Sequence, residues 1–456
     1  MRARSLPESP LPHPLLTAPI GRSLLRLSGP TTALMVVQIF VAIAETWYVG
    51  RLGRDALAGL ALVFPFMALM LNVANGGMGG GVASAMARAL GAGRTEDARA
   101  LVLHALVIGL AIGVGFTAFA LTLAPSVYGL MGGKGNALAQ ALALSNLWFA
   151  GAALAWVSSF FAALLRGSGD SATPARYGLL ASLVYVPLSG VLALGGAGWS
   201  GFGIQGVAIA SLVATTLALL LQARSLWRGR LGFTPRLTGI RLQGRLFGEI
   251  LKVGIMGSVT SITGNLTAIL VTGLIGSFGT AALAGYGIGV RLEYMVAPLA
   301  FGIGTGLTTL VGVAAGAEDW RRANKVAWIG GLISFAAIGA IGWMVALLPE
   351  TWARLFTAEP QVIAASVAYI TRVAPFYCLF GLGLTLYFAS QGAGRMATPL
   401  VASLVRQGIV TVCGWLAVER LGLGLHGVFA VLAAGMFVYG CLIAGPLLIR
   451  PWRSRL

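Results

Sequence analysis

A carboxylate, Glu45, lies near the end of the first long apolar run of this 456-residue chain. An ionised side chain in hydrocarbon is so costly that such residues face protein or a water-filled cavity. Either a proton or an organic cation can neutralise a carboxylate in that setting, so we predict that Glu45 is a proton-coupling residue. It lies about five residues, or roughly 8 Å, from the expected helix end. A pair with Arg51 or Arg54 is therefore the alternative.

A second acid, Glu293, follows Arg291 by two residues in a later apolar run. Residues two apart do not share a helix face. We therefore expect Glu293 to face a cavity while Arg291 faces protein or the interface; a structural ion pair is the alternative. Arg372 is either a partner of one of these acids or a side chain that snorkels to the interface.

Several amides and one tryptophan occupy apolar runs and are candidates for lining such a cavity. Buried amides also form hydrogen bonds between helices, at about 0.6 kcal/mol in one series. Aromatic rings attract organic cations, but they also pack between helices and anchor them at the membrane interface. The candidate lining residues are Gln38, Asn72, Asn75, Trp148 and Asn265, with Asn146 and Gln407 as further buried amides.

The sequence carries no pattern expected of an enzyme, a metal site or a nucleotide site. His13, His104 and His426 are far apart and lack metal-ligand spacing. The segment GLMGGKG (129–135) does not match the phosphate-binding loop. The three cysteines lie in apolar runs and cannot pair evenly, so no disulfide framework is expected. We expect no catalysis, no metal and no cofactor.

The composition requires a membrane around these residues. Hydrophobic residues make up 57% of the chain and charged residues only 10%, whereas soluble proteins carry about 25% charged residues. The net charge of +18 does not indicate a nucleic-acid partner, because the basic residues lie in short gaps between apolar runs. We predict an all-α polytopic membrane protein whose partners are membrane lipid and small molecules.

The apolar runs predict twelve transmembrane helices, each separated from the next by Gly, Pro or charged residues. Two of them exceed 30 residues and must tilt, kink or protrude. The predicted spans are 28–50, 57–87, 100–124, 138–165, 173–195, 203–226, 250–276, 283–314, 325–348, 362–390, 398–418 and 425–448.

The basic residues predict the orientation of these spans. If the N-terminus is cytoplasmic, the inside segments hold most of the basic residues, including a dense group from Arg224 to Lys252. Cytoplasmic loops are enriched in Lys and Arg, so both termini are expected in the cytoplasm. The outside loops would hold only Arg51, Arg54, Lys134, Arg354 and Arg420.

The two halves of the chain resemble each other. GRLGRDALAGLAL (50–62) matches GSFGTAALAGYGI (276–288), and RGSGDSATP (166–174) matches QGAGRMATP (391–399), at offsets of 226 and 225. GAGRTEDARALV (91–102) also matches GAEDWRRANKVA (316–327). Because each half has an even number of spans, the repeats must be parallel and related by a pseudo-two-fold axis along the membrane normal.

These repeats define the predicted domains. They are a cytoplasmic tail (1–27), an N-lobe with helices 1–6 (28–226), a cytoplasmic linker (227–249), a C-lobe with helices 7–12 (250–449) and a second cytoplasmic tail (450–456).

The same motifs resemble the multidrug and toxic compound extrusion (MATE) family over nearly the whole chain. They are Pro30, the string Glu45–Gly53, ALAG (56–59), ALGAGR (89–94), RGSGDSATP (166–174) and RLEYMVAPLAFGIGTG (291–306). The resemblance implies a twelve-helix, two-lobe secondary antiporter that exports organic, often cationic, compounds in exchange for H⁺ or Na⁺. It also implies a multi-pass protein of a bacterial cytoplasmic membrane, and we expect a monomer.

The chain departs from the family pattern at several acids. The family usually has Asp where this chain has Glu45, and its fifth helix often carries Asn and Asp. Tyr185 and Ser189 lie near those places here, and both are candidate lining residues. The seventh and tenth spans carry no acid, which favours H⁺ over Na⁺ because a hard cation prefers several oxygen ligands. Pro30 is the candidate hinge of the first span.

A flippase for lipid-linked glycans or phospholipids, from the same superfamily, is the other transporter hypothesis. Such proteins commonly have a cationic cavity for phosphate, and they often have extra helices. This chain offers few cations at membrane positions and only twelve spans. Those cations are Arg291, Arg372 and Arg406.

Overall fold

The structure, a computed structural model, describes residues 13–196, 198–235, 239 and 241–453. The ends of the two predicted tails (1–12 and 454–456) and linker residues 236–238 and 240 lie outside this set. The described chain folds into long helices with short connections. Eleven helical segments are long and apolar enough to cross a membrane, and a pair bent by 50° makes a twelfth. The predicted all-α fold with twelve spans is confirmed.

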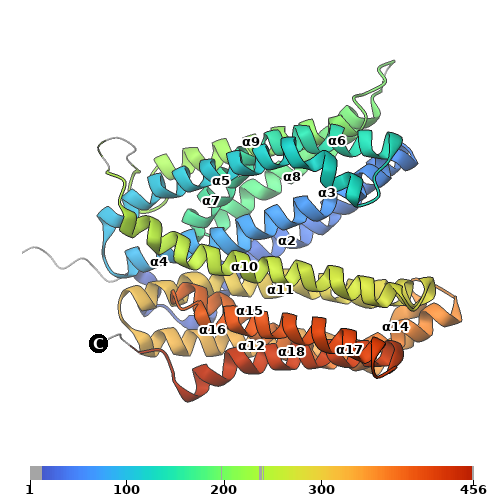
Figure 1. The fold of residues 1–456 in the computed structure, drawn as a ribbon. Helices are drawn as coiled ribbons and strands as arrows, with labels where there is room; N and C mark the ends of the chain where they lie inside the picture. Colours follow the sequence, from blue (N-terminus) through green and yellow to red (C-terminus); the bar gives the residue numbers. More distant parts are fainter. Residues whose placement is uncertain (1–12, 197, 236–238, 240, 454–456) are drawn as a thin grey trace, which may run out of the picture.

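The helices form two bundles that lie side by side (Figure 1). The first contains α2 (Ile20–Arg51), α3 (Arg54–Asn72), η1 (Val73–Met78), α4 (Gly79–Gly91), α5 (Thr95–Leu130), the bent pair α6 (Gly135–Ala150) and α7 (Ala152–Gly167), α8 (Ala172–Leu194) and α9 (Ile204–Trp227). The second contains α10 (Gly244–Gly276), α11 (Thr280–Gly316), α12 (Trp320–Leu347), α14 (Pro360–Val373), η2 (Ala374–Phe376), α15 (Tyr377–Gly392), α16 (Ala397–Gly408), η3 (Ile409–Cys413), α17 (Gly414–Glu419) and α18 (Gly424–Ile449). Two short helices, α1 (Pro14–Thr17) and α13 (Pro349–Arg354), lie outside the spans.

Two helices begin earlier than the hydropathy pattern predicts. Residues 20–27 of the predicted tail belong to α2, and residues 244–249 of the predicted linker belong to α10. In both segments charged residues alternate with buried apolar ones: Leu24 and Leu27 are buried in α2, and Leu246 is buried in α10. Mean hydropathy falls in such a segment, but one helix face still packs against protein.

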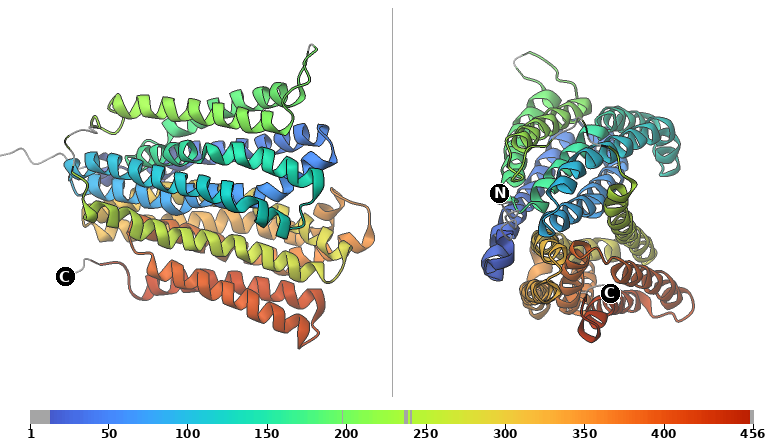
Figure 2. Two further views of the ribbon diagram at one scale, coloured as in Figure 1. Left: turned by 45° about the horizontal axis from the view of Figure 1, so that its top comes forward. Right: turned by 90° about the vertical axis from the view of Figure 1, so that its left-hand side faces the viewer.

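Both ends of the described chain, and the connection between α9 and α10, lie at one end of the bundle, which we call the terminal end (Figures 1 and 2). The turn between α2 and α3 lies at the other end, which we call the opposite end. The lobes meet through α11, which packs on α2 and α4, and through α10, which packs on η1 and α4.

Pairs of glycines make these interlobe contacts symmetric. A Cβ atom on Gly77 would meet Ser258, and one on Gly302, 225 residues later, would meet Thr32. A second pair, Gly81 and Gly306, faces residues 250–254 and residues 24–28 in the same way. In each pair, the two glycines are related by the repeat offset, and so are the residues that they approach. The helices of the two lobes can approach closely here because glycine has no side chain. The predicted pseudo-two-fold relation of the lobes therefore appears in atomic contacts.

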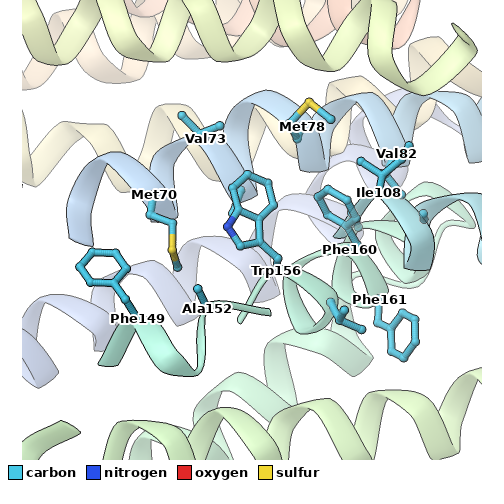
Figure 3. Close-up of a cluster of buried hydrophobic side chains, with 14 of the residues drawn as sticks. Met70, Val73, Met78, Val82, Ile108, Phe149, Ala152, Trp156, Phe160 and Phe161 are labelled. Carbon is cyan, nitrogen blue, oxygen red and sulfur yellow. The ribbon is translucent and has the colours of Figure 1, made fainter. Parts of the chain in front are cut away.

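Buried aromatic side chains pack inside the first lobe. Trp156 and Phe160 are fully buried, and their rings meet edge to face at 5.6 Å. They lie among Met70, Met78 and other apolar side chains from α3 to α7 (Figure 3). Such packing fixes α7 against its neighbours.

Hydrogen bonds join the lobes at the terminal end. Ser84 Oγ donates to the carbonyl of Gln391 at 2.5 Å, and Arg88 donates to the carbonyl of Glu249 at 3.4 Å. Gln391 Nε2 donates to the carbonyl of Gly76 at 2.8 Å. Gly76 lies in η1, a π-helix, where the usual backbone hydrogen-bond register is changed.

An ion cluster continues this junction at the surface. Arg245 Nη2 lies 2.6 Å from Asp97 Oδ1, across the lobe interface. Arg94 lies 3.0 Å from Asp97 and 3.5 Å from Glu249. The side chains are partly exposed, so each pair stabilises the closed terminal end by only about 0.2–1 kcal/mol.

We expect Arg245→Gln to lower the population of the closed terminal end by up to roughly fivefold, because it removes about 1 kcal/mol or less. The effect should shrink as salt screens the remaining charges. Spin-label distances between α5 and α10, measured in a cysteine-free background, report this population. Arg99→Gln is the matched control, since Arg99 pairs with Glu96 inside α5. Equal distance distributions for Arg245→Gln and this control would contradict the prediction.

Candidate functional site

Glu45 is held by a tyrosine from another helix of the first lobe. The Tyr185 hydroxyl on α8 donates to Glu45 Oε2 on α2 at 2.8 Å. Tyr185 is buried, whereas Glu45 keeps partial exposure. Small residues on α8 allow the approach: Gly178 lies against Leu34, and Gly190 lies against the ring of Tyr48.

A second polar contact joins the same two helices. Gln38 Nε2 donates to Ser182 Oγ at 3.2 Å. Gln38 and Glu45 are seven residues apart and so share a face of α2, while Ser182 lies one turn before Tyr185. Ser189, one turn after Tyr185, is also buried. The structure therefore brings four predicted residues onto one α2–α8 seam: Gln38, Glu45, Tyr185 and Ser189.

The alternative in which an arginine clamps Glu45 is not supported. The Arg51 guanidinium lies over the Trp47 ring, 4.7 Å from its centroid. Within the described chain, none of the ion pairs involves Glu45 or Arg54. Glu45 thus carries a carboxyl group that only neutral groups contact.

The other predicted lining residues of the first lobe are used elsewhere. Trp148 Nε1 donates to Ser211 Oγ at 3.2 Å, between α6 and α9. Asn75 lies in η1, where its Oδ1 accepts from Ser159 Oγ at 2.7 Å. Asn72 is exposed. None of these three side chains bonds to Glu45 or Tyr185.

Asn75 also lines a very small cavity between the lobes. This cavity has a volume of about 10 Å³ and is lined as well by Arg166, Thr308 and Gln391. That volume holds about one water molecule. The buried Gln391 Oε1, unpartnered among the described residues, supplies an acceptor for it.

The second lobe holds its own carboxyl group, Glu293, on α11. The Tyr369 hydroxyl on α14 donates to Glu293 Oε1, and the Tyr377 hydroxyl lies 3.3 Å from that of Tyr369. The ring of Tyr286 meets the ring of Tyr369 edge to face at 5.5 Å. Sequence reasoning missed these three tyrosines. The only available signal was the pair Tyr369 and Tyr377, which flank Pro375 in the tenth span.

Neither Arg291 nor Arg372 forms an ion pair with Glu293 in the described structure. Arg291 is exposed and lies 4.9 Å from the ring centroid of Phe356. Arg291 and Glu293 thus lie on different faces of α11, as their two-residue spacing predicts. Arg372 donates to the carbonyl of Ala368 in its own helix at 3.1 Å. Asn265 likewise donates to the carbonyl of Ser261, one turn earlier in α10, at 2.9 Å.

The two carboxyl groups do not obey the symmetry of the scaffold. The position equivalent to Glu45 at an offset of 226 is Val271, a buried apolar residue of α10. Glu293 lies instead on α11, whose equivalent in the first lobe is the α3–α4 span. A pseudo-symmetric two-lobe frame of spanning helices, with one carboxyl group inside each lobe on different helices, is the arrangement of a two-lobe membrane transporter. No cluster of three or more His, Cys, Asp or Glu side chains that could hold a metal ion occurs in the described part of the chain.

Comparison with known proteins identifies the family. The MatE family profile matches residues 30–191 and 258–416, one block in each lobe. The chain belongs to the MatE family, whose members are transporters and not enzymes. Pro30, at the start of the first block, lies inside α2 and is compatible with a continuous helix there.

Curated relatives match over most of their length. A probable multidrug resistance protein NorM of Thermotoga maritima is 24% identical over 85% of this chain and 83% of the relative. A FAD transporter of Shewanella oneidensis is 25% identical over 92% of each protein.

A solved structure has the same fold. It is a MOP superfamily transporter from Pyrococcus furiosus, with a TM-score of 0.88 and 25% identity, covering 96% of this chain and 97% of that chain. For that protein, a reversed polarity of the binding pocket was taken to suggest a different function.

Proposed function

We propose that this protein is a secondary active multidrug efflux antiporter that exports organic, cationic compounds in exchange for H⁺. The observation that carries the proposal is the setting of Glu45: a partly exposed carboxyl group in a spanning helix, held by Tyr185 and free of any described ion pair. No cation of the described chain forms an ion pair with this carboxylate, so a proton and a cationic substrate can compete for it. The relatives named as multidrug resistance proteins support export of drug-like compounds.

The architecture supports alternating access. The lobes are joined by hydrogen bonds and an ion cluster at the terminal end, while Glu45 lies on the part of α2 near the opposite end. Transporters with parallel repeats rock one lobe against the other around a site between them. The two conformations differ in which end is closed, and a ligand shifts the balance by binding one of them better.

We place the terminal end in the cytoplasm of a bacterium, with the chain as a multi-pass protein of the cytoplasmic membrane. The excess of Arg and Lys at that end supports this orientation. In the conformation described, the cytoplasmic side is then closed. Glu45 is nearer the outside, where it takes a proton and releases a bound cation.

The return step uses the same residues. After the lobes rock, the proton of Glu45 leaves toward the cytoplasm and the carboxylate binds the next cation. The Tyr185 hydroxyl donates to the ionised carboxylate of Glu45 and holds Oε2 in place while the carboxyl group gains and loses its proton. Pro30 removes one backbone hydrogen bond from α2, and we assign to it the bend that this step requires.

The surroundings of Glu45 favour H⁺ over Na⁺ as the coupling ion. Sodium, a hard cation, prefers several oxygen ligands. Among the described residues, Glu45 accepts a hydrogen bond from the hydroxyl of Tyr185, while Gln38 and Ser182 bond to each other. We propose a monomer that needs no cofactor.

The test is transport in proteoliposomes that contain the purified protein. H⁺ and Na⁺ gradients are imposed separately, and a panel of cationic dyes is followed with FAD as an anionic comparison. We expect dye movement with the H⁺ gradient and none with the Na⁺ gradient alone. Na⁺-driven movement would overturn the coupling assignment. Binding of lipid-linked pyrophosphate without dye transport would favour a flippase.

A further inference from the structure

A large cavity in the second lobe lies apart from both carboxyl groups. Its volume is about 760 Å³, and it lies at the opposite end between α13, α14 and α18. One face of α14 lines it, with Ile363, Ala364, Val367, Thr371 and Arg372 at helical spacing.

This cavity faces away from the other lobe. The reverse face of α14 packs on α11, where Gly285 approaches Ala365 and Gly289 approaches the ring of Tyr369. Since α11 lies between α14 and the first lobe, this face of α14 points toward the periphery of the bundle, where membrane lipid surrounds a spanning helix.

The cavity contains a cation with no acid partner. Arg354 is paired with Glu350 at 3.0 Å at the rim. The Arg372 guanidinium donates to the carbonyl of Ala368, and no ion pair of the described residues includes it. A partly buried guanidinium in a spanning helix is costly unless an anion or water compensates it. Arg406, another arginine in a spanning helix of this lobe, differs because an aromatic ring faces its guanidinium: the centroid of the Phe380 ring lies 5.0 Å away.

The rest of the lining suits a polar head group. Thr357, Ala358, Ala364, Ala368 and Thr371 are small and leave room beside the helix. His426 on α18 and Arg354 on α13 also line the cavity and add donors. Basic side chains beside spanning helices attract acidic lipid head groups by their charge.

We propose that this cavity is a binding site for the head group of an acidic glycerophospholipid. The phosphate lies against Arg372, and the polar group beyond it extends toward Thr357, Arg354 and His426. The acyl chains leave along the peripheral surface of the lobe. A guanidinium suits this role because its planar donors match phosphate oxygens.

The test is native mass spectrometry of the detergent-purified full chain, titrated with phosphatidylglycerol or with phosphatidylcholine. We expect the wild-type protein to retain phosphatidylglycerol selectively. Arg372→Gln should lower this retention roughly tenfold, because a charge-assisted hydrogen bond is lost. Arg372→Lys should retain an intermediate amount of phosphatidylglycerol, since lysine keeps the positive charge but lacks the paired planar donors of the guanidinium.

The controls separate a site from general charge attraction. Arg54→Gln removes an exposed arginine of the first lobe at the same end and should leave retention unchanged. Thermal unfolding of each variant checks the fold, and the graded response from Arg to Lys to Gln is one that misfolding would not produce. Wild-type selectivity in Arg372→Gln, or equal loss in Arg54→Gln, would overturn the proposal. So would displacement of the lipid by soluble glycerol 3-phosphate, which would assign the cavity to a free organic phosphate.

Discussion

Glu45→Gln is expected to abolish proton-driven efflux, to the level of protein-free vesicles, and to leave the fold intact. The amide is nearly isosteric with the carboxyl group, and its carbonyl oxygen can still accept from Tyr185, so the α2–α8 contact persists. It cannot be ionised, so it neither attracts a cation nor releases a proton. Dye efflux from proteoliposomes under an imposed pH gradient measures the loss, and thermal unfolding measures the fold.

Two further variants show whether the loss belongs to Glu45. Glu45→Asp keeps an ionisable group and should retain pH-gradient-driven efflux. Glu293→Gln changes the carboxyl group of the second lobe, which Tyr369 holds in a comparable way. If Glu293→Gln abolishes efflux and Glu45→Gln does not, the proton is carried by the second lobe and the assignment to Glu45 is wrong.

The spans were predictable because hydropathy, glycine and basic residues all mark them. The helix starts at Ile20 and Gly244 were not, since they lie in amphipathic segments whose buried face is visible only once a partner is known. The π-helix at Val73–Met78 was also not predictable. It depends on backbone register against α10, and local sequence does not specify that register.

Part of the site of the first lobe was predictable. A carboxylate in a spanning helix needs polar surroundings, which singled out Glu45. Tyr185 was a candidate because it lies near the place where the MATE family carries polar residues in its fifth helix, and it bonds to Glu45. Asn265 shows the opposite case: its amide bonds to the carbonyl one turn earlier. Such local bonds compete with cavity lining, and side-chain type alone does not reveal them.

The repeat explains why the scaffold and the chemistry diverge. Glycines and their partners recur at offsets of 225 and 226, because both lobes must approach each other equally closely. The carboxyl groups are free of that requirement, and Val271 occupies the place equivalent to Glu45. The scaffold is therefore symmetric between the lobes, whereas the positions of the carboxyl groups are not.

The last pair of matched glycines gives the second large effect. Gly91 on α4 and Gly316 on α11 are 225 residues apart and lie at the terminal end. A Cβ on Gly91 would lie 2.1 Å from the carbonyl oxygen of Val313, and one on Gly316 would lie 2.1 Å from that of Arg88. Both obstacles are backbone atoms, which cannot rotate away. We expect Gly91→Ala and Gly316→Ala each to force the lobes apart at this end and to shift the protein strongly toward the conformation open there.

Cysteine accessibility at the terminal end, in a background without the three native cysteines, measures this shift, and dye efflux should fall with it. Gly248→Ala is the control, because Gly248 lies on α10 at the same end of the bundle and a Cβ there would meet no other atom within 4 Å. Alanine favours an isolated helix over glycine by about 1 kcal/mol, so helix propensity would act in the opposite direction to the expected loss. The close approach of α4 and α11 is what closes this end, and accessibility equal to that of Gly248→Ala in both variants would refute it.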